Sequence, residues 1–380
     1  MEEVKSFKDL SLEVVEAGIC GKCGGCVSFC SAGELNALRM GKNELPQYIS
    51  EENCLKCGIC YLICPQTHTL DGELQEKFSW KLPVGSYQKV ISAQTTNEKI
   101  RKICTDGGVV TSLLMYLLER NLINGAIVSK KIGPFARKAT IAKTHEELLE
   151  AAGSAFSGSL HLEELGGKYT TYTPILSTVK SLEGKYLQDI AVVGTPCQIN
   201  AIRKMQCMGI IPAHLVKYTI GLFCTENFSF DDVARERLEK KLDINLSDIV
   251  KLNIKDDFMI TLTKDVTIHI PLAEIDEVAR PACSACQDFS NEYADISVGG
   301  LGSPDGYTTT LIRTESGSSI FDGALRKGYI RERTFESAEV SKLEKTKMMA
   351  KIVSHSRRKK MRAKKRLSKL TRGGALSGKT

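Results

Sequence analysis

From Lys89 onward, hydrophobic and polar positions alternate in a pattern that predicts an α/β domain. Short runs rich in Val, Ile and Ala predict strands over residues 89–93, 125–129, 138–142, 189–193 and 216–223. Apolar positions spaced by three or four residues predict helices over residues 100–103, 109–121, 146–152, 174–182, 197–205 and 231–241. Strands that alternate with helices are typical of an α/β fold.

A second β-rich region follows, and simpler segments flank the domain. Residues 250–254, 258–263 and 266–270 predict a hairpin or meander, strands are expected over 295–299 and 308–313, and a closing helix over 318–327. Near the start, the amphipathic stretch 7–15 predicts a short lead-in helix. We therefore expect a small N-terminal domain over residues 1–70, a linker over 71–87, a larger mixed α/β domain over 88–340 and a tail over 341–380.

The composition limits the class of protein. With 380 residues, 42% of them hydrophobic, the chain can bury the cores of two domains. The longest apolar run, near Val109 to Leu118, is too short to span a bilayer. Fourteen cysteines without an opening signal peptide favour a reducing compartment over secretion. The expectation is a soluble cytoplasmic protein, or one peripheral to a membrane complex.

The net charge of +7 is unevenly distributed. From Lys342 onward there are 15 Lys or Arg residues and one acidic residue. The rest of the chain holds 37 of the 52 basic and 44 of the 45 acidic residues, so it is acidic overall. This basic tail is expected to be a helix or disordered. A partner subunit, an anionic lipid surface and nucleic acid all compete as its target. No aromatic residues are interleaved for base stacking, so partner docking is favoured over nucleic acid.

Eight cysteines near the N-terminus form two copies of one motif, Cys-x2-Cys-x2-Cys-x3-Cys. The first copy starts at Cys20, the second starts at Cys54, and the second ends in Cys64 followed by Pro65. This spacing is that of two-cluster ferredoxins, in which the fourth cysteine of each copy binds the other cluster. We therefore expect two 4Fe-4S clusters, the first held by Cys20, Cys23, Cys26 and Cys64 and the second by Cys54, Cys57, Cys60 and Cys30.

Small residues in these two loops suit a backbone that wraps closely around sulfur. Gly21, Gly24, Gly25 and Gly58 lie where that wrapping is required. Zinc ribbons need two pairs of cysteines and disulfides need an oxidising compartment, so neither explains two runs of three cysteines plus one. Ser31 replaces the proline expected after the first copy, which removes no ligand.

Four further cysteines could form another site: Cys197, Cys224, Cys283 and Cys286. The first two each follow a predicted strand, so their thiols could emerge at one edge of a sheet, and the Cys-x2-Cys pair could complete four ligands. The residues alone leave open a third metal centre, of iron-sulfur or zinc, and separate buried thiols. The two remaining cysteines are expected to be structural: Cys104 and Cys207.

The sequence Thr105-Asp-Gly-Gly-Val-Val-Thr111 precedes a strongly helical run. Thr105 or Asp106 could cap that helix, and the following glycines, Gly107 and Gly108, could let a phosphate approach its first amides. Capped Gly-Gly helix starts are common in proteins, so the signal is weak by itself. No Gly-x-Gly-x-x-Gly follows a strand, and a conventional Rossmann nucleotide site therefore has no support.

Several motifs together resemble the beta subunit family of coenzyme F420 hydrogenases and dehydrogenases. The resemblance covers about residues 88–335 and rests on Val193-Gly-Thr-Pro-Cys-Gln-Ile199, Gly221-Leu-Phe-Cys-Thr-Glu-Asn-Phe228, Pro281-Ala-Cys-Ser-Ala-Cys-Gln-Asp-Phe289, Ala294-Asp-Ile-Ser-Val-Gly299, Gly306-Tyr-Thr308 and Ile312-Arg-Thr314. The cysteine-rich front segment is similar to that of the longer members.

The resemblance implies an FAD-binding protein that uses coenzyme F420 as substrate and holds an iron-sulfur cluster beside the flavin. Carried over by position, Cys197, Cys224, Cys283 and Cys286 would hold this third 4Fe-4S cluster. The implied FAD contacts are Asp106, Gly107, Gly108, Thr111, Lys168, Tyr169, Thr195 and Pro196. Gly167-Lys-Tyr169 resembles the family's Gly-Ser-Lys-Tyr element with Gly in place of Ser, and a similar Ala151-Ala-Gly-Ser-Ala155 precedes it. Lys168 and Arg280 are candidates to meet coenzyme carboxylates or phosphate.

The implied activity is an F420-dependent oxidoreductase subunit of the kind found in anaerobic methanogenic archaea. Hydride exchange between F420 and FAD would need placement rather than a side-chain acid or base, and single electrons would leave through the clusters. The implied partners are a heterodisulfide reductase, a formate dehydrogenase, a hydrogenase or a membrane-bound F420 dehydrogenase. The alternatives are a ferredoxin-driven FAD and iron-sulfur reductase, like the family's chlorophyll-metabolism relatives, and an electron-relay subunit without catalysis of its own.

Overall fold

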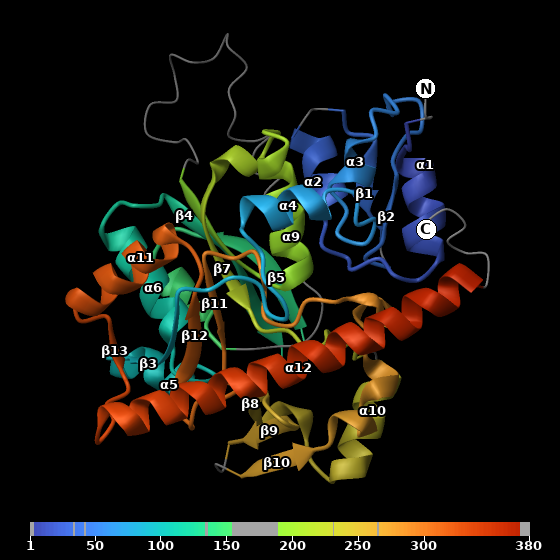
Figure 1. Ribbon diagram of the computed structural model, residues 1–380. Coiled ribbons are helices and arrows are strands. Elements are labelled where there is room, and N and C mark those ends of the chain that lie inside the picture. The colour runs from blue at the N-terminus through green and yellow to red at the C-terminus, as the bar shows by residue number, and fades with distance from the viewer. Residues whose placement is uncertain are drawn as a thin grey trace.

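The fold is taken from a computed structural model of the chain (Figure 1). The structure describes residues 4–32, 35–41, 43–133, 136–153, 189–230, 232–263 and 266–372. The expected helix over 174–182 lies outside these ranges, and so do Lys168 and Tyr169.

One mixed sheet of eight strands organises the described part of the large domain. Its order is β13-β3-β12-β11-β7-β6-β4-β5, and the pairs β11–β7, β7–β6 and β6–β4 are parallel. The strands are β3 (Lys89–Thr95), β4 (Gly125–Gly133), β5 (Ala136–Ala142), β6 (Ile190–Gly194), β7 (Val216–Leu222), β11 (Ile296–Gly299), β12 (Thr308–Ile312) and β13 (Ile330–Glu332). The expected mixed α/β class is confirmed. The short strand β13 had no sequence signal.

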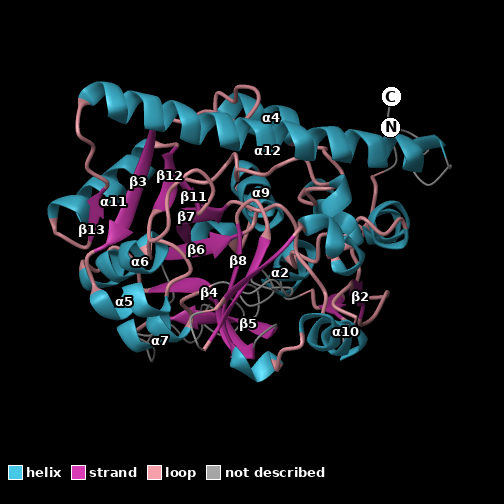
Figure 2. Cartoon of the chain, turned by 90° about the horizontal axis from the view of Figure 1, so that it is seen from below, coloured by secondary structure: helices cyan, strands magenta, loops and turns pink. Residues whose placement is uncertain are grey.

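Helices cover both faces of this sheet, which explains the continuous hydrophobic runs of its strands. In β6, Ala191 and Val193 belong to the core under one set of helices, and Val192 faces the core on the other side. Figure 2 shows the first set on one side and α9 and α12 on the other. The first set is α5 (Glu98–Ile103), α6 (Val109–Glu119), α7 (His145–Glu150) and α11 (Glu315–Arg326), and α9 spans Pro196–Cys207.

Residues 232–278 form a small lobe below the sheet (Figure 1). The expected meander is present as three antiparallel strands, and Phe228, Phe230 and Phe258 form the centre of a separate apolar core. The elements are α10 (Asp232–Leu242), β8 (Ile249–Ile254), β9 (Phe258–Leu262) and β10 (Thr267–Ile270). Short 3-10 turns connect the elements of this part of the chain: Ala213–Leu215 precedes β7, and Leu246–Asp248, Leu272–Glu274, Asp276–Val278 and Pro281–Ala285 follow it.

The N-terminal module, residues 4–70, is small and rich in loops. It contains α1 (Phe7–Leu10), a π-helical turn (Ser11–Glu16), α2 (Gly25–Ala32), β1 (Leu38–Met40), β2 (Pro46–Tyr48) and α3 (Ile59–Leu62). The expected lead-in helix packs its Phe7, Leu10 and Val14 into the core that also holds most of the module's cysteines. The module lies against α9, because Ile63, Phe29 and Ile59 join the core around Ile199.

The segment 71–87, predicted to be a linker, is fixed to its neighbours. It begins with helix α4 (Asp71–Lys77), and Asp71 pairs with the fully buried Lys204 of α9 at 3.0 Å. Farther along, Nη1 of Arg313 donates to the carbonyl oxygens of Val84 and Ser86, both at 2.9 Å. Several polar groups of this segment thus make specific bonds to residues far away in the sequence.

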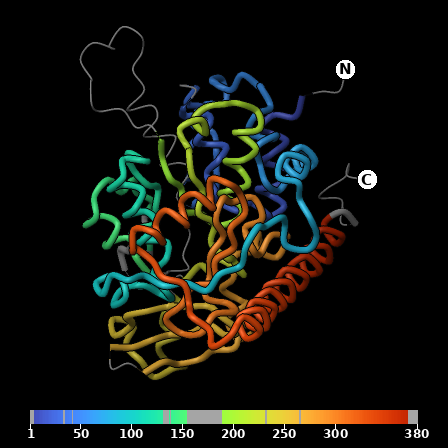
Figure 3. The backbone as a smooth tube through the Cα atoms, turned by 60° about the vertical axis from the view of Figure 1, so that its left-hand side comes forward, coloured from blue at the N-terminus to red at the C-terminus, as the bar shows by residue number. Residues whose placement is uncertain are grey.

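The basic segment forms α12 (Ala338–Arg372), a 35-residue helix, which decides between the two conformations that the sequence left open. In Figure 3 it runs from the large domain toward the N-terminal module. Near its start, Met348 and Ile352 are buried, and near its end Leu367 and Leu370 pack on the core of the module. Within the described ranges, no helix is both long and apolar enough to cross a bilayer.

Candidate functional site

The two cysteine loops of the N-terminal module repeat one backbone conformation. Lys22 and Lys56 have φ of 53° and 51°, and Gly24 and Gly58 have φ of 79° and 76°. Each pair occupies the same two positions of the Cys-x2-Cys-x2-Cys motif. Glycine accepts such left-handed values at little cost, whereas lysine does not, so the tight turn is imposed twice at the same place. The duplicated spacing therefore corresponds to a duplicated shape.

The fourth cysteine of each copy lies with the opposite loop. Electrostatic interactions link the thiols of Cys20, Cys23 and Cys26 with Cys64, and those of Cys54, Cys57 and Cys60 with Cys30. The crossed grouping is the one that the motif leads us to expect.

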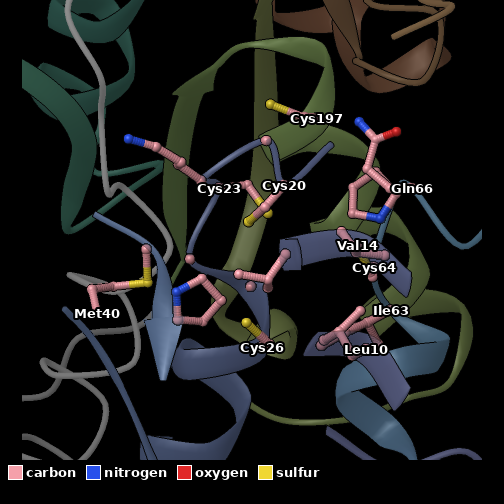
Figure 4. Close-up of a pocket in the computed structure, with 17 residues that line it drawn as sticks. Leu10, Val14, Cys20, Cys23, Cys26, Met40, Ile63, Cys64, Gln66 and Cys197 are labelled. Atoms are coloured by element: carbon pink, nitrogen blue, oxygen red, sulfur yellow. The ribbon is translucent and has the colours of Figure 1, made fainter. Parts of the chain in front are cut away.

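The first of these groups surrounds a cavity (Figure 4) with about 490 Å³ of empty space. Cys20, Cys23, Cys26 and Cys64 line it together with Cys197 of α9, and apolar side chains such as Leu10 and Ile63 complete the wall. Burial raises the pKa of the Cys20 thiol to about 12, and it raises those of Cys23 and Cys26 as well. Buried thiols of this kind must lose their protons when they bind a metal.

The donor set fits 4Fe-4S clusters. Among the described residues, no three His, Cys, Asp or Glu side chains come close enough to hold one metal ion. A cubane does not require such closeness, because each thiolate binds a different iron corner. Four cysteines around one space with a largely apolar wall are the kind of donor set that a cubane needs.

The third cysteine group is assembled by the sheet. Strands β6 and β7 are parallel neighbours, with Gly194 opposite Gly221, so Cys197 and Cys224 leave the same edge. Cys283 and Cys286 come from the turn Pro281–Ala285 and the residue after it. The thiol of Cys224 interacts electrostatically with the other three, and burial raises its pKa to about 12.

A much larger cavity, with about 1530 Å³ of empty space, opens beside the third cysteine group at the N-terminal ends of α6 and α9. Four of the expected cofactor contacts line it: Asp106, Gly108, Thr111 and Thr195. The first amides of α6 have no partner within the helix and lie at this wall. Cys224 also lines this cavity, whereas Cys197, two residues after Thr195, lines the cavity of the first group. The third group therefore stands between the two cavities.

One expectation about the start of α6 is wrong. Neither Thr105 nor Asp106 caps the helix, because Gly108, with φ of 70°, is the N-cap residue and no side chain bonds to it. Asp106 Oδ1 instead accepts a hydrogen bond of 3.1 Å from Asn253 Nδ2. The amide of Gly107 donates to Thr308 Oγ1 at 2.9 Å, and Thr308 lines the cavity whereas Gly107 does not.

Two other candidates have different surroundings from those expected. Pro196 is the first residue of α9 and is buried, but it does not line the large cavity. Arg280 forms an ion pair of 3.5 Å with Glu44 of the N-terminal module and interacts with Cys197. Arg280 therefore lies beside the third cysteine group.

Two family models match the large domain. They describe the N-terminal and C-terminal parts of the coenzyme F420 hydrogenase/dehydrogenase beta subunit and match residues 90–166 and 187–338, more than half of the chain. The chain belongs to this family.

Known relatives agree with this assignment. The chain is 32% identical over 353 residues to a coenzyme F420-dependent sulfite reductase from Methanocaldococcus jannaschii, over 88% of this chain and 50% of that protein. It therefore spans only half the length of that relative. The chain is also 32% identical over 260 residues to coenzyme F420 hydrogenase subunit beta from Methanothermobacter thermautotrophicus, over 67% of this chain and 88% of the relative.

A solved structure shares the fold. It is a chain of the F420-reducing NiFe hydrogenase complex from Methanosarcina barkeri, which aligns with a TM-score of 0.65 and 28% identity. The alignment covers 77% of this chain and 96% of that chain.

The large cavity of this family member is also lined by residues that the sequence did not single out, among them Arg137, Asn253 and Lys255. The guanidinium of Arg137 donates to the carbonyl oxygens of Ser129, Ala151 and Gly153. Burial lowers its pKa to about 10, and its buried Nε has no hydrogen-bond partner among the described residues. These positions could not be found from motifs, because the contacts join segments that are distant in sequence.

Proposed function

We propose that this chain is the F420-linked electron-transfer subunit of a larger redox complex. It would hold FAD in the large cavity and three 4Fe-4S clusters on its twelve grouped cysteines. One observation carries the proposal: the third cysteine group lies between the large cavity and the first cysteine group, with Cys224 lining one cavity and Cys197 the other. Such a row suits electrons that pass from one carrier to the next.

The residues of the large cavity fit a flavin nucleotide. The start of α6 offers amides and the positive end of a helix, and the lining also contains two cations, Arg137 and Lys255, the second of which pairs with Asp305 at 2.6 Å. Phosphate groups would be held there by charge-assisted hydrogen bonds. Apolar residues such as Val128 and Leu222 form other parts of the wall, where a flat ring system could be packed and water excluded.

When bound, the flavin would supply the conversion between two-electron exchange with the deazaflavin F420 and one-electron exchange with a cluster. The chain's own contribution is placement. The third cysteine group borders the large cavity, so a cluster there would be the nearest to the flavin. In the second group, Cys57 is exposed, and that group is therefore the natural point of exchange with a partner protein.

The test is anaerobic purification followed by assays of iron, flavin and F420 oxidation. We expect about twelve irons per chain, four for each cubane, together with bound FAD and bleaching of reduced F420 coupled to an artificial acceptor. Cys283→Ala should lose about four irons, one cubane. The control Cys207→Ala, in α9 and outside the three groups, should keep all of them.

Three results would contradict parts of this proposal. About eight irons in the unaltered protein would remove the third cluster. Bound flavin without any reaction with F420 would favour the ferredoxin-driven reductase. Absence of flavin would favour a relay subunit.

A further inference from the structure

Helix α12 brings a buried lysine into the third cysteine group. The side chain of Lys359 is only 5% exposed, and its Nζ donates a hydrogen bond of 2.5 Å to the carbonyl oxygen of Cys224. Its charge interacts with the thiols of all four proposed ligands, Cys197, Cys224, Cys283 and Cys286. The sequence suggested that this basic segment reaches outward, whereas this lysine points into its own chain.

The other cations near the same group are neutralised by carboxylates. Arg280 pairs with Glu44, and Arg362, which donates to the carbonyl oxygen of Cys283 at 3.3 Å, pairs with Glu226. Lys359 forms no ion pair with a carboxylate in the part of the chain that the structure describes. Its positive charge interacts most strongly with the thiols, and after them with the carboxylate of Asp288.

Burying a charged lysine away from water costs free energy unless its charge is paired with an opposite charge or hydrogen-bonded. Four thiolates give a 4Fe-4S cluster a net negative charge, which grows by one when the cluster accepts an electron from the reduced flavin. A nearby positive charge stabilises the more negative, reduced form, and net charge around a cluster is one of the factors that set its potential. No bond is formed or broken in this step.

We propose that Lys359 raises the reduction potential of the third cluster by placing a buried positive charge beside its ligands. This inference rests on the proposed third cluster. Lys359 acts as a positioning residue, since it would tune the cluster without binding it. It also lies beyond residue 338, where the match to the family models ends, so this chain supplies the charge from its own C-terminal helix.

The experiment compares four full-length proteins, purified anaerobically with their clusters: the unaltered chain, Lys359→Met, Lys359→Arg and the control Lys351→Met. Lys351 lies on the same helix and is exposed, pairing with Asp256 at 3.6 Å. Iron content is measured first, and each cluster's midpoint potential then comes from a redox titration followed by electron paramagnetic resonance. The signal of the third cluster is the one that Cys283→Ala removes.

We expect Lys359→Met to keep its iron and to lower the midpoint of the third cluster alone. A tenfold change in the equilibrium corresponds to about 59 mV for one electron. Lys359→Arg and Lys351→Met should both retain the original midpoint. An unchanged midpoint in Lys359→Met, or an equal fall in Lys359→Arg, would overturn the inference. Loss of the third cluster's iron from Lys359→Met would also overturn the inference, because the lysine would then be needed for assembly of the cluster. About eight irons in the unaltered chain would instead overturn the proposed function.

Discussion

Gly107 shows how closely one residue can be enclosed. A Cβ atom there would lie 2.5 Å from the carbonyl oxygen of Ala93 and 2.6 Å from the amide nitrogen of Thr308, which are both backbone atoms. Gly107→Ala should therefore destabilise the large domain by about 1–3 kcal/mol through overpacking. The measurement is the melting temperature, which should fall by several degrees.

Gly72→Ala is the matched control for that substitution. Gly72 lies in helix α4, and no heavy atom lies within 4 Å of its added Cβ. Alanine is the better helix former by about 0.5–1 kcal/mol, so the melting temperature should stay the same or rise slightly. Equal melting temperatures for the two variants would show that the space around Gly107 is not restrictive.

At this scale, short-range patterns predicted more than long-range ones. The cysteine loops were predictable because their cysteines recur every three residues. The sequence also repeats the glycine of the tight backbone turn, as Gly24 in the first loop and Gly58 in the second. The partner of Asp106 was not, because Asn253 is 147 residues away. Neighbouring residues alone therefore led to the prediction that Asp106 caps the helix that follows it.

Among the elements, α12 depends most on its tertiary contacts. Ile352 is fully buried, in one core with Leu311 of β12. Ile352→Ala should cost about 2–5 kcal/mol by leaving a cavity in that core. Met361 lies on the same helix but is 68% exposed, so Met361→Ala should change stability by less than about 0.5 kcal/mol. Thermal melting of the two variants measures the difference, and similar losses would mean that the contact with β12 contributes little.

The strands of the large sheet were predicted well because burial on both faces gives continuous apolar runs. Helix α12 was ambiguous because nearly half of its residues are charged, and a basic stretch of this kind can be helical or disordered. Its apolar positions gain their stabilising contacts only when β12 and the N-terminal module are present. Contacts with distant segments, rather than local propensity, decide its conformation.

For the whole molecule, Lys204 joins the N-terminal module to the large domain. Its Nζ donates to the carbonyl oxygen of Cys64 at 3.1 Å and pairs with Asp71 at 3.0 Å, and its side chain is fully buried. Lys204→Met would leave both partners without this donor and should cost about 1–3 kcal/mol.

The control is Lys217→Met. Lys217 pairs with Asp189 at the surface, at 3.2 Å, and such exposed pairs contribute about 0–1 kcal/mol. Melting temperatures of the two variants should therefore differ by several degrees, with Lys204→Met the lower. If both fall equally, Lys204 does not hold the two parts together.

The arrangement of the modules could be predicted only in part. The spacing of Cys197 and Cys224 after two strands indicated that their thiols share one edge, and β6 and β7 are indeed parallel neighbours. Neither the strand order nor the position of the N-terminal module against α9 follows from local patterns, because both depend on contacts such as that of Ile63 with the core around Ile199.

The end of α12 also has a consequence for synthesis. Leu367 and Leu370 pack on the same core as Phe7 and Leu10, so residues translated early make contacts with residues translated much later. Part of this core in the N-terminal module therefore stays exposed to solvent until more than three hundred further residues have been translated. Contacts over such long separations slow folding. Insertion of iron during translation would thus meet a module whose surface is still open.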